Sequence, residues 1–180
     1  MKLKIITSIA LFAAIASWGQ QAFAANPQDL EQLKSVKSCP RCDLTGADLT
    51  QFNLTGANLR EAKLGGANLS QVNLQNADLT GANLEGAILT GVNLSSASLT
   101  GVNLKAANLE NADLSFAGFL SANLEAANLK GAKTLLTNFR GSNFRLTTMA
   151  DGTVTSDKPY WWSLQEGAAK PEKPEKKKKK

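Results

Sequence analysis

Between residues 42 and 131 the chain repeats one pattern of apolar and polar positions every five residues, eighteen times and without an insertion. The third place of each block is Leu, with Phe119 as the single substitute, the first is nearly always Ala, and the second is usually Asn or Asp. In an extended chain the Leu and the Ala two residues before it face one side, and the polar residue between them faces the other. The last two places hold mainly Thr, Ser, Gly, Glu, Lys or Gln, which suit a turn.

A period of five predicts a chain that bends after every block. Asn and Asp side chains bond to nearby backbone and favour bends. A helix would carry the Leu positions around its surface, and a long strand would alternate every two residues, so neither element fits. Each block is therefore predicted to be a very short strand and a corner. Blocks that always turn the same way wind into a solenoid with Leu and Ala inside, an architecture that favours scaffolding or binding over catalysis.

The blocks, which include ADLTG and ANLKG, resemble the A-(D/N)-L-x-x motif of the pentapeptide-repeat family. The match is strict over 42–131 and loose over 132–151, where Phe139, Phe144 and Met149 keep the Leu spacing. The resemblance implies an all-β solenoid, specifically a right-handed quadrilateral β-helix with four blocks, about twenty residues, in each coil. It also suggests an exported member of the kind found in the cyanobacterial periplasm or thylakoid lumen.

Two features of the sequence support a spacing of twenty independently. Phe52, Val72 and Val92 fill the usual Ala place at intervals of twenty. In stacked coils, residues twenty apart would be vertical neighbours. The outward charges that step by twenty and alternate in sign are Glu85, Lys105, Glu125 and Arg145.

The N-terminal segments are predicted to be a leader and a cap. Residues 1–24 combine a basic start, a short apolar run and an A-x-A site, which is typical of a signal peptide cut after Ala24. An uncleaved membrane anchor is the alternative, but the apolar run is too short to span a bilayer comfortably. Residues 25–41 are predicted to form a short helical cap, because Asn26 suits an N-cap and Pro27 the first helical position.

The remaining predicted segments are the β-helix over 42–151, a capping segment over 152–164 and a disordered Lys-rich tail over 165–180. The aromatic residues 160–162 are expected to fold back onto the last coils. The tail is interpreted as a solvated segment that keeps the protein soluble, although weak contact with an anionic membrane, a cell-wall polymer or nucleic acid is an alternative.

Charge and composition exclude several functions. The whole chain has a net charge of +5, but between Ala25 and Ala169 it carries 11 basic and 13 acidic residues, a net of −2. The folded part is thus nearly neutral. There is no His, the commonest general base and metal ligand. The Asp residues of the array interchange with Asn, which favours support of turns over acid–base catalysis. We therefore expect no catalytic residue, no metal and no cofactor.

Cys39 and Cys42 form the one chemically suggestive motif, a C-x-x-C. Two thiols without His cannot supply the four ligands of a zinc site. The βαβ setting of a thioredoxin-type site is missing from the pattern. Export to an oxidising compartment favours a structural disulfide between them, with a redox function as the alternative.

Apolar residues in outward places predict a possible interaction patch. In the register of twenty, Phe116 and Leu136 share one outward column, and Leu120 and Leu135 fall nearby. Exposed apolar clusters usually mark contacts, although the chain's own C-terminal segment could cover this one.

In the block 132–136, Thr134 takes the Leu place. We expect its side chain to point inward with a bonded hydroxyl, and the alternative is a bulge that turns Leu135 inward.

Three functions remain open at this stage. The favoured one is a non-enzymatic structural or protein-interaction module, monomeric, with an unknown protein partner in the periplasm or the thylakoid lumen. The second, suggested by the resemblance, is a gyrase-interacting protein that mimics DNA through an acidic rod. The net charge and the predicted export argue against it, so no nucleic acid partner is expected. The third is a thiol redox protein that uses Cys39 and Cys42.

Overall fold

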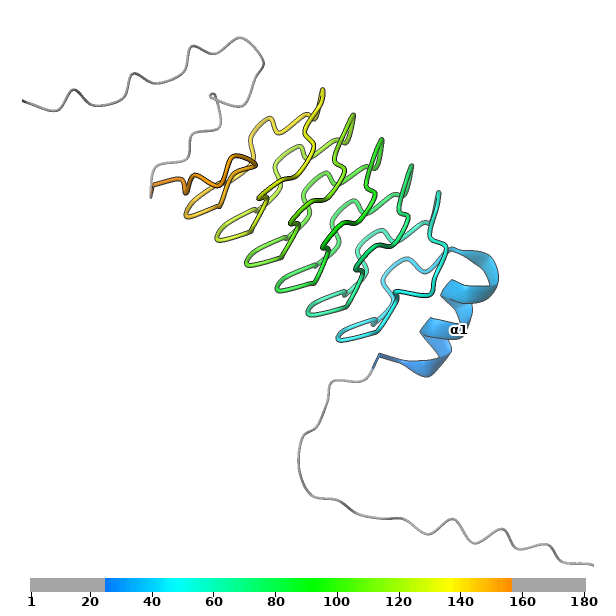
Figure 1. The fold of residues 1–180 in the computed structure, drawn as a ribbon. Helices are drawn as coiled ribbons and strands as arrows, with labels where there is room; N and C mark the ends of the chain where they lie inside the picture. Colours follow the sequence, from blue (N-terminus) through cyan, green and yellow to red (C-terminus); the bar gives the residue numbers. More distant parts are fainter. Residues whose placement is uncertain (1–24, 157–180) are drawn as a thin grey trace, which may run out of the picture.

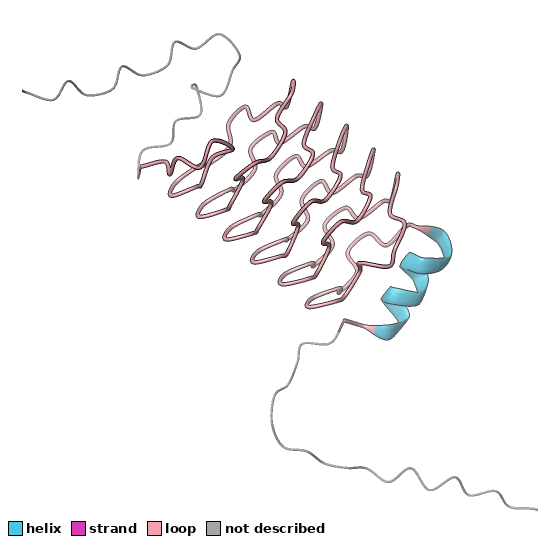
Figure 2. Ribbon diagram, in the orientation of Figure 1, coloured by secondary structure: helices cyan, strands magenta, loops and turns pink. Residues whose placement is uncertain are grey.

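The computed structural model describes residues 25–156, which form one helix and a coiled rod (Figure 1). Helix α1, Pro27–Val36, lies across one end of the rod, and the coils stack behind it (Figure 2). Single parallel bridges join residues exactly twenty apart, from Ser38 with Asn58 to Asn128 with Thr148. This confirms four blocks in each coil. Each side is too short for a continuous strand, so the described residues form a four-sided solenoid of isolated bridges.

The repeat pairs every backbone N–H group of a typical block. In block 82–86, three N–H groups donate to carbonyls of neighbouring coils at 2.7–2.9 Å, and a fourth donates across the corner to Leu79 at 3.0 Å. The fifth, that of Glu85, donates to Oδ1 of Asn83 at 3.1 Å. An unpaired backbone donor is costly wherever water cannot reach it. The second place of the block therefore favours an oxygen-bearing side chain, which is why Asn and Asp recur there.

The interior follows the predicted alternation. The centre residues of the array, from Leu44 to Leu129, are at most 1 % exposed, and nearly all the first-place Ala residues are buried with them. The larger first-place residues Val72 and Val92 are buried, and Phe52 is partly buried against the core. Burial of these stacked side chains is the main stabilising contribution, since it is repeated on every side of every coil.

Helix α1 closes the first coil. Asn26 caps it by accepting a hydrogen bond from the Gln28 N–H at 3.0 Å, and Leu33 is fully buried beneath it. Oδ2 of Asp29 accepts a bond from the N–H of Asp43 at 2.7 Å. The helical cap is thus present, and the first side of the coil already begins directly after it, within residues 37–41.

A disulfide joins Cys39 to Cys42, with 5.4 Å between their Cα atoms. Cys39 occupies a Leu place and Cys42 an Ala place, so the bridge spans the first corner from inside. Both residues are buried, at 0 % and 6 % exposure. The bridge therefore fastens the corner that follows the cap.

The last coil is closed by aromatic rings and hydroxyl groups. The ring of Phe119 lies 5.0 Å from that of Phe139, which lies 5.3 Å from Phe144. Ser142 and Thr147 replace Ala and are buried. Hydroxyl groups in the first place of a block donate hydrogen bonds to backbone carbonyl oxygens of the preceding coil. The bonds are Thr137 to Leu114 at 2.7 Å, Ser142 to Phe119 at 2.5 Å and Thr147 to Leu124 at 2.6 Å.

The expectation of a buried Thr134 is wrong, because the structure leaves this residue exposed. No bulge is present: Lys133 and Asn138 keep their bonds to the preceding coil at 2.9 Å, and Leu135 is not in the core. The reason is the position of this block at the end of the rod. Residues 152–155 turn back to pair with Thr148 on another side, so they do not stack over this one.

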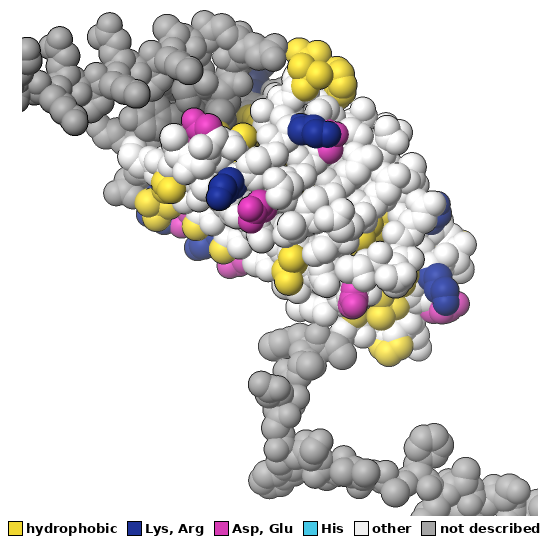
Figure 3. Space-filling view, viewed as in Figure 1, with side chains coloured by type: hydrophobic (Ala, Val, Ile, Leu, Met, Phe, Trp, Pro, Cys, Tyr) yellow, Lys and Arg dark blue, Asp and Glu magenta, His cyan; other side chains and the backbone are white. Residues whose placement is uncertain are grey.

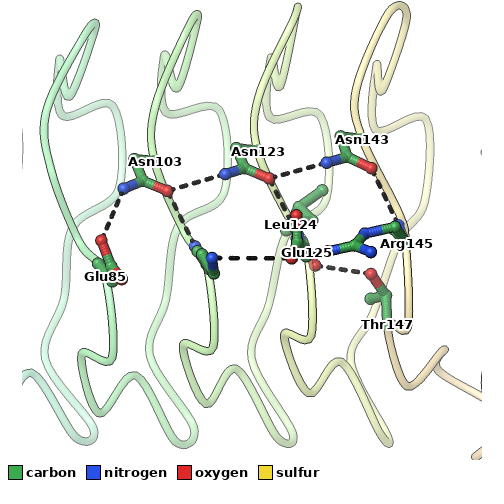
Figure 4. Close-up of polar contacts among 9 residues, drawn as sticks. Glu85, Asn103, Asn123, Leu124, Glu125, Asn143, Arg145 and Thr147 are labelled. Atoms are coloured by element: carbon green, nitrogen blue, oxygen red, sulfur yellow. Dashed lines mark hydrogen bonds and ion pairs between the residues drawn. The ribbon is translucent and has the colours of Figure 1, made fainter.

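The expected column of alternating charges is present in part, beside a ladder of amides (Figure 4). Glu125 forms ion pairs with Lys105 at 3.7 Å and with Arg145. Glu85 instead accepts a bond from Asn103 at 3.2 Å. In the ladder, Asn143 donates to Asn123, and Asn123 donates to Asn103, both at 3.2 Å. These exposed pairs contribute little energy but favour the register of twenty.

The leader at residues 1–24 and the tail at 165–180 lie outside the described residues, as do the aromatic residues 160–162. The predictions made for these segments therefore stay predictions.

Replacing a centre residue should cost far more than replacing an outward one. Leu84→Ala should lower the free energy of unfolding by about 2–5 kcal/mol, because it opens a cavity between coils. Gln75→Ala changes an exposed side chain and should stay within about 0.5 kcal/mol of wild type. Chemical denaturation followed by circular dichroism measures both. Equal losses for the two variants would contradict the assignment of inward and outward places.

Acid should weaken the corners that Asp supports. The N–H and hydroxyl of Thr50 both donate to Asp48 and hold the pKa of that carboxyl below its usual value. A lowered folded pKa gives stability that is present above the unfolded value, near about 4, and is lost as the pH falls through the folded pKa. Asp48→Asn keeps the acceptor but removes the titration. Its melting temperature should therefore depend less on pH below about pH 4 than that of wild type; identical profiles would contradict this role.

The disulfide should act on stability alone. In unreduced protein Cys39 and Cys42 should present no thiol that can be alkylated, as mass spectrometry can show. Because the bridge closes a short loop, Cys39→Ala together with Cys42→Ala should cost about 2 kcal/mol through chain entropy, with a further loss because Cys39 is a core residue. Alkylatable thiols in protein from its native compartment, or reduction of insulin by the protein, would contradict this role.

Candidate interaction surface

The Asp residues that were considered as candidates for acid–base catalysis have structural roles. The Asp residues of the array support corners: the hydroxyl and N–H of Thr45, for example, donate to Asp43 and lower the pKa of its carboxyl. Within residues 25–156 no group of three or more His, Cys, Asp or Glu is arranged to hold a metal ion. In the same range every buried side-chain N or O atom has a hydrogen-bond partner.

Exposed apolar side chains gather in the last coils. Phe116, Leu120, Leu135 and Leu136, here called the apolar patch, are 55 %, 36 %, 53 % and 59 % exposed. Figure 3 shows hydrophobic side chains that protrude at the upper corner of the last coils. The broad face next to them consists mostly of backbone and of side chains that are neither hydrophobic nor charged. Stacking places Phe116 beside the later pair, because its N–H donates to the Leu135 carbonyl at 2.8 Å. The structure thus brings the residues of the predicted patch onto adjacent coils.

Part of this patch is held in a strained backbone conformation. Phe116 and Leu136 have φ of 63° and 53°, and Leu146 has 57°. Other corners of the array meet the same left-handed requirement mainly with Gly, Asn, Ser or Ala, and at Arg41, Glu61 and Gln71 with long polar side chains. The array places a bulky apolar residue there only in its last coils. A large side chain at such a φ costs on the order of 1 kcal/mol. Fold stability therefore does not explain why bulky apolar residues occupy these corners.

Gly118 belongs to this surface, but the sequence predictions do not include it. Gly118 lies between Phe116 and Leu120 and is the single Gly in the Asn or Asp place of the array. Its φ is not in the left-handed range, and a Cβ added there would meet no atom within 4 Å. Neither backbone geometry nor crowding requires Gly. Its position among Asn and Asp in the repeat is the signal that could have identified it.

Charges elsewhere on the rod are interleaved rather than gathered by sign. Cations and acids pair between coils, with Arg41 next to Glu61 at 2.8 Å and Lys63 next to Asp43 at 3.2 Å. Further pairs are Arg60 with Asp78, Lys105 with Glu125, Lys133 with Asp113, and Arg145 with Glu125. A continuous acidic stripe does not form from side chains that are paired in this way.

Among the described residues, no helix is long and apolar enough to cross a membrane.

Comparison with solved structures identifies similar folds. The pentapeptide repeat protein Rfr23 from the cyanobacterium Cyanothece is 31 % identical, with a TM-score of 0.60, over 68 % of this chain and 95 % of that one. A pentapeptide repeat protein of the Arabidopsis thaliana thylakoid lumen is 30 % identical over 59 % of this chain and 71 % of that one, with a TM-score of 0.34. A third, from Nostoc, is 26 % identical over 68 % and 98 %, with a TM-score of 0.46. A search of curated proteins gave no match.

The family comparison agrees with the geometry of the coil. The family model of pentapeptide repeats matches in eight copies, over residues 39–76, 77–115 and 122–151, which is more than half of the chain. Its last copies extend into the region where Phe replaces Leu, and there the coil continues without a bulge. This chain belongs to the pentapeptide repeat family.

Proposed function

We propose that this chain is a non-enzymatic structural and protein-interaction module, and that it contacts its partner through the apolar patch of Phe116, Leu120, Leu135 and Leu136. The observation that carries the proposal is the strained, exposed pair Phe116 and Leu136. Apolar exposure and backbone strain both cost stability, and strain of this kind often accompanies function. The interleaved charges and the buried disulfide supply no competing site.

The compartment we propose is an exported one, the periplasm or the thylakoid lumen. Support comes from the leader-like pattern of residues 1–24 and from the Cys39–Cys42 bridge, since disulfides persist in oxidising compartments. We propose that the protein works there as a monomer, and that the Lys-rich tail adds at most weak contact with anionic surfaces.

The alternative functions have less support. Mimicry of DNA needs an acidic surface, whereas ion pairs neutralise five acids along this rod, and export would separate the protein from gyrase. Redox catalysis needs an accessible sulfur, whereas Cys39 and Cys42 are buried. The interaction module agrees best with both observations.

The test replaces the strained pair with Asn, which adopts left-handed φ readily. Phe116→Asn with Leu136→Asn should leave the melting temperature unchanged or raise the free energy of unfolding by about 1 kcal/mol. The matched control is Ile88→Asn, which removes another exposed apolar side chain at a distant place. Each form, exported in the source cell, is cross-linked in its own compartment and analysed by mass spectrometry.

The proposal expects one partner that cross-links to wild type and to the Ile88 variant and is lost from the double variant. Retention of the same partner by a folded double variant would overturn the assignment of the patch. Failure of all forms to cross-link any protein specifically would overturn the interaction function itself.

A further inference from the structure

We propose that the surface around Gly118 is a notch that recognises an extended segment of a protein partner in which a large apolar side chain stands next to a carboxylate. The inference rests on the proposed function and specifies which partner chemistry the patch accepts. We define the notch as Gly118 with Phe116 and Leu120 on either side and Leu136, Asn138 and Arg140 one coil above.

Gly118 interrupts a column of polar side chains that are stacked twenty residues apart, namely Ser38, Asn58, Asp78, Ser98 and Asn138. In two other columns an amide in this place donates to the amide one coil before, as Asn128 does to Asn108 at 3.1 Å and Asn123 to Asn103 at 3.2 Å. In the column of the notch, Gly118 pairs through its backbone with Ser98 and Asn138 but contributes no side chain. A Cβ added at Gly118 would meet nothing within 4 Å, so the space directly outside this backbone position is open.

The gap leaves hydrogen-bond donors without their usual acceptors. In a regular block the second-place oxygen accepts the N–H two residues later, as Asn123 does for Glu125 at 3.2 Å. Gly118 cannot do this for the N–H of Leu120. The amide nitrogen of Asn138 likewise lacks the side-chain oxygen that stacked amides use below them. Within residues 25–156 neither donor has an acceptor. The N–H groups of Gly65 and Thr90 also lack one, but there Lys63 and Ile88 fill the position that is open at Gly118. A partner's oxygen atoms can therefore satisfy the two donors of the notch.

A cation stands above the same gap. The N–H of Ser121 donates to the carbonyl of Arg140 at 3.0 Å, which places Arg140 one coil above the Leu120 side of the notch. Arg140 is exposed, and within the described part of the chain no acid lies at ion-pair distance from it. The other Arg residues of the rod do pair with acids. A guanidinium beside two N–H donors fits a carboxylate.

Apolar side chains supply the other half of the site. Phe116 and Leu120 stand two residues before and after Gly118, and both are exposed, at 55 % and 36 %. The position of the missing Gly118 side chain lies between them in the sequence of this side. Leu136 extends the Phe116 wall by one coil, because Leu135 and Leu136 stack on Ser115 and Phe116. An occupant therefore needs an apolar side chain for the walls and an acid for the donors.

The test uses the chain purified after export, labelled with ¹⁵N and titrated with Ac-Ser-Leu-Asp-Ser-NH₂. We expect the amide resonances of Gly118 and Leu120 to shift and saturate. The peptides Ac-Ser-Ala-Asp-Ser-NH₂ and Ac-Ser-Leu-Asn-Ser-NH₂ should bind at least about tenfold more weakly, because each removes one half of the recognition. Arg140→Gln should weaken binding and reduce its dependence on salt.

The decisive variant is Gly118→Asn, which fills the notch and restores both missing hydrogen bonds. It should keep or raise the melting temperature while removing peptide binding, so loss of binding cannot be attributed to unfolding. Ile88→Asn is the matched control, because it restores a side-chain oxygen at the same place of another side. It should bind the peptide as wild type does.

Three results would overturn the notch. One is unchanged peptide binding by Gly118→Asn, and another is no saturable shift with the Leu-Asp peptide. The third is a Leu120 resonance that moves with protein concentration in the absence of peptide, which would identify a second copy as the occupant. If Gly118→Asn also retains the cross-linked partner, the interaction function stands and only the notch fails.

Discussion

Most corners of this coil leave one backbone amide that neighbouring coils do not pair, and in the Asn and Asp blocks the side chain two residues earlier accepts its hydrogen bond. The other four N–H groups of a block find carbonyls without help from side chains, as block 82–86 shows. The fifth makes the repeat selective for Asn and Asp. This requirement, together with the narrow interior filled by Leu and Ala, limits what each place of the repeat tolerates.

The same requirement explains the effect of residues that depart from the repeat. Where Thr, Ser or Val replaces Ala, the interior is altered, and hydroxyls such as those of Ser142 and Thr147 bond to carbonyls and avoid an unsatisfied buried group. Where Gly118, Ile88 or Lys63 takes the second place, the N–H two residues later has no side-chain oxygen to bond. Gly118 differs from the other two because it also leaves the space next to its Cα open.

Much of the fold could be predicted from the sequence because its contacts are regular. The places of Leu and Ala, the helical cap and the register of twenty all follow from local periodicity, and the structure has them. Thr134 could not be placed correctly, because its exposure depends on whether a further coil lies above it. That depends on the path of residues 152–155, which carry no repeat. The patch residues were visible as apolar exceptions, but Gly118 becomes informative only when the amides around it are located.

The four-sided stacking also determines which changes of length this molecule can absorb. An insertion or deletion of one block keeps every buried Leu in place, but it rotates all later sides by a quarter turn relative to α1. An insertion of four blocks restores the original orientation and only lengthens the rod. The number of blocks between α1 and Gly118 therefore determines the angle between the cap and the surface around Gly118. Insertion or deletion of whole blocks changes that angle in quarter-turn steps.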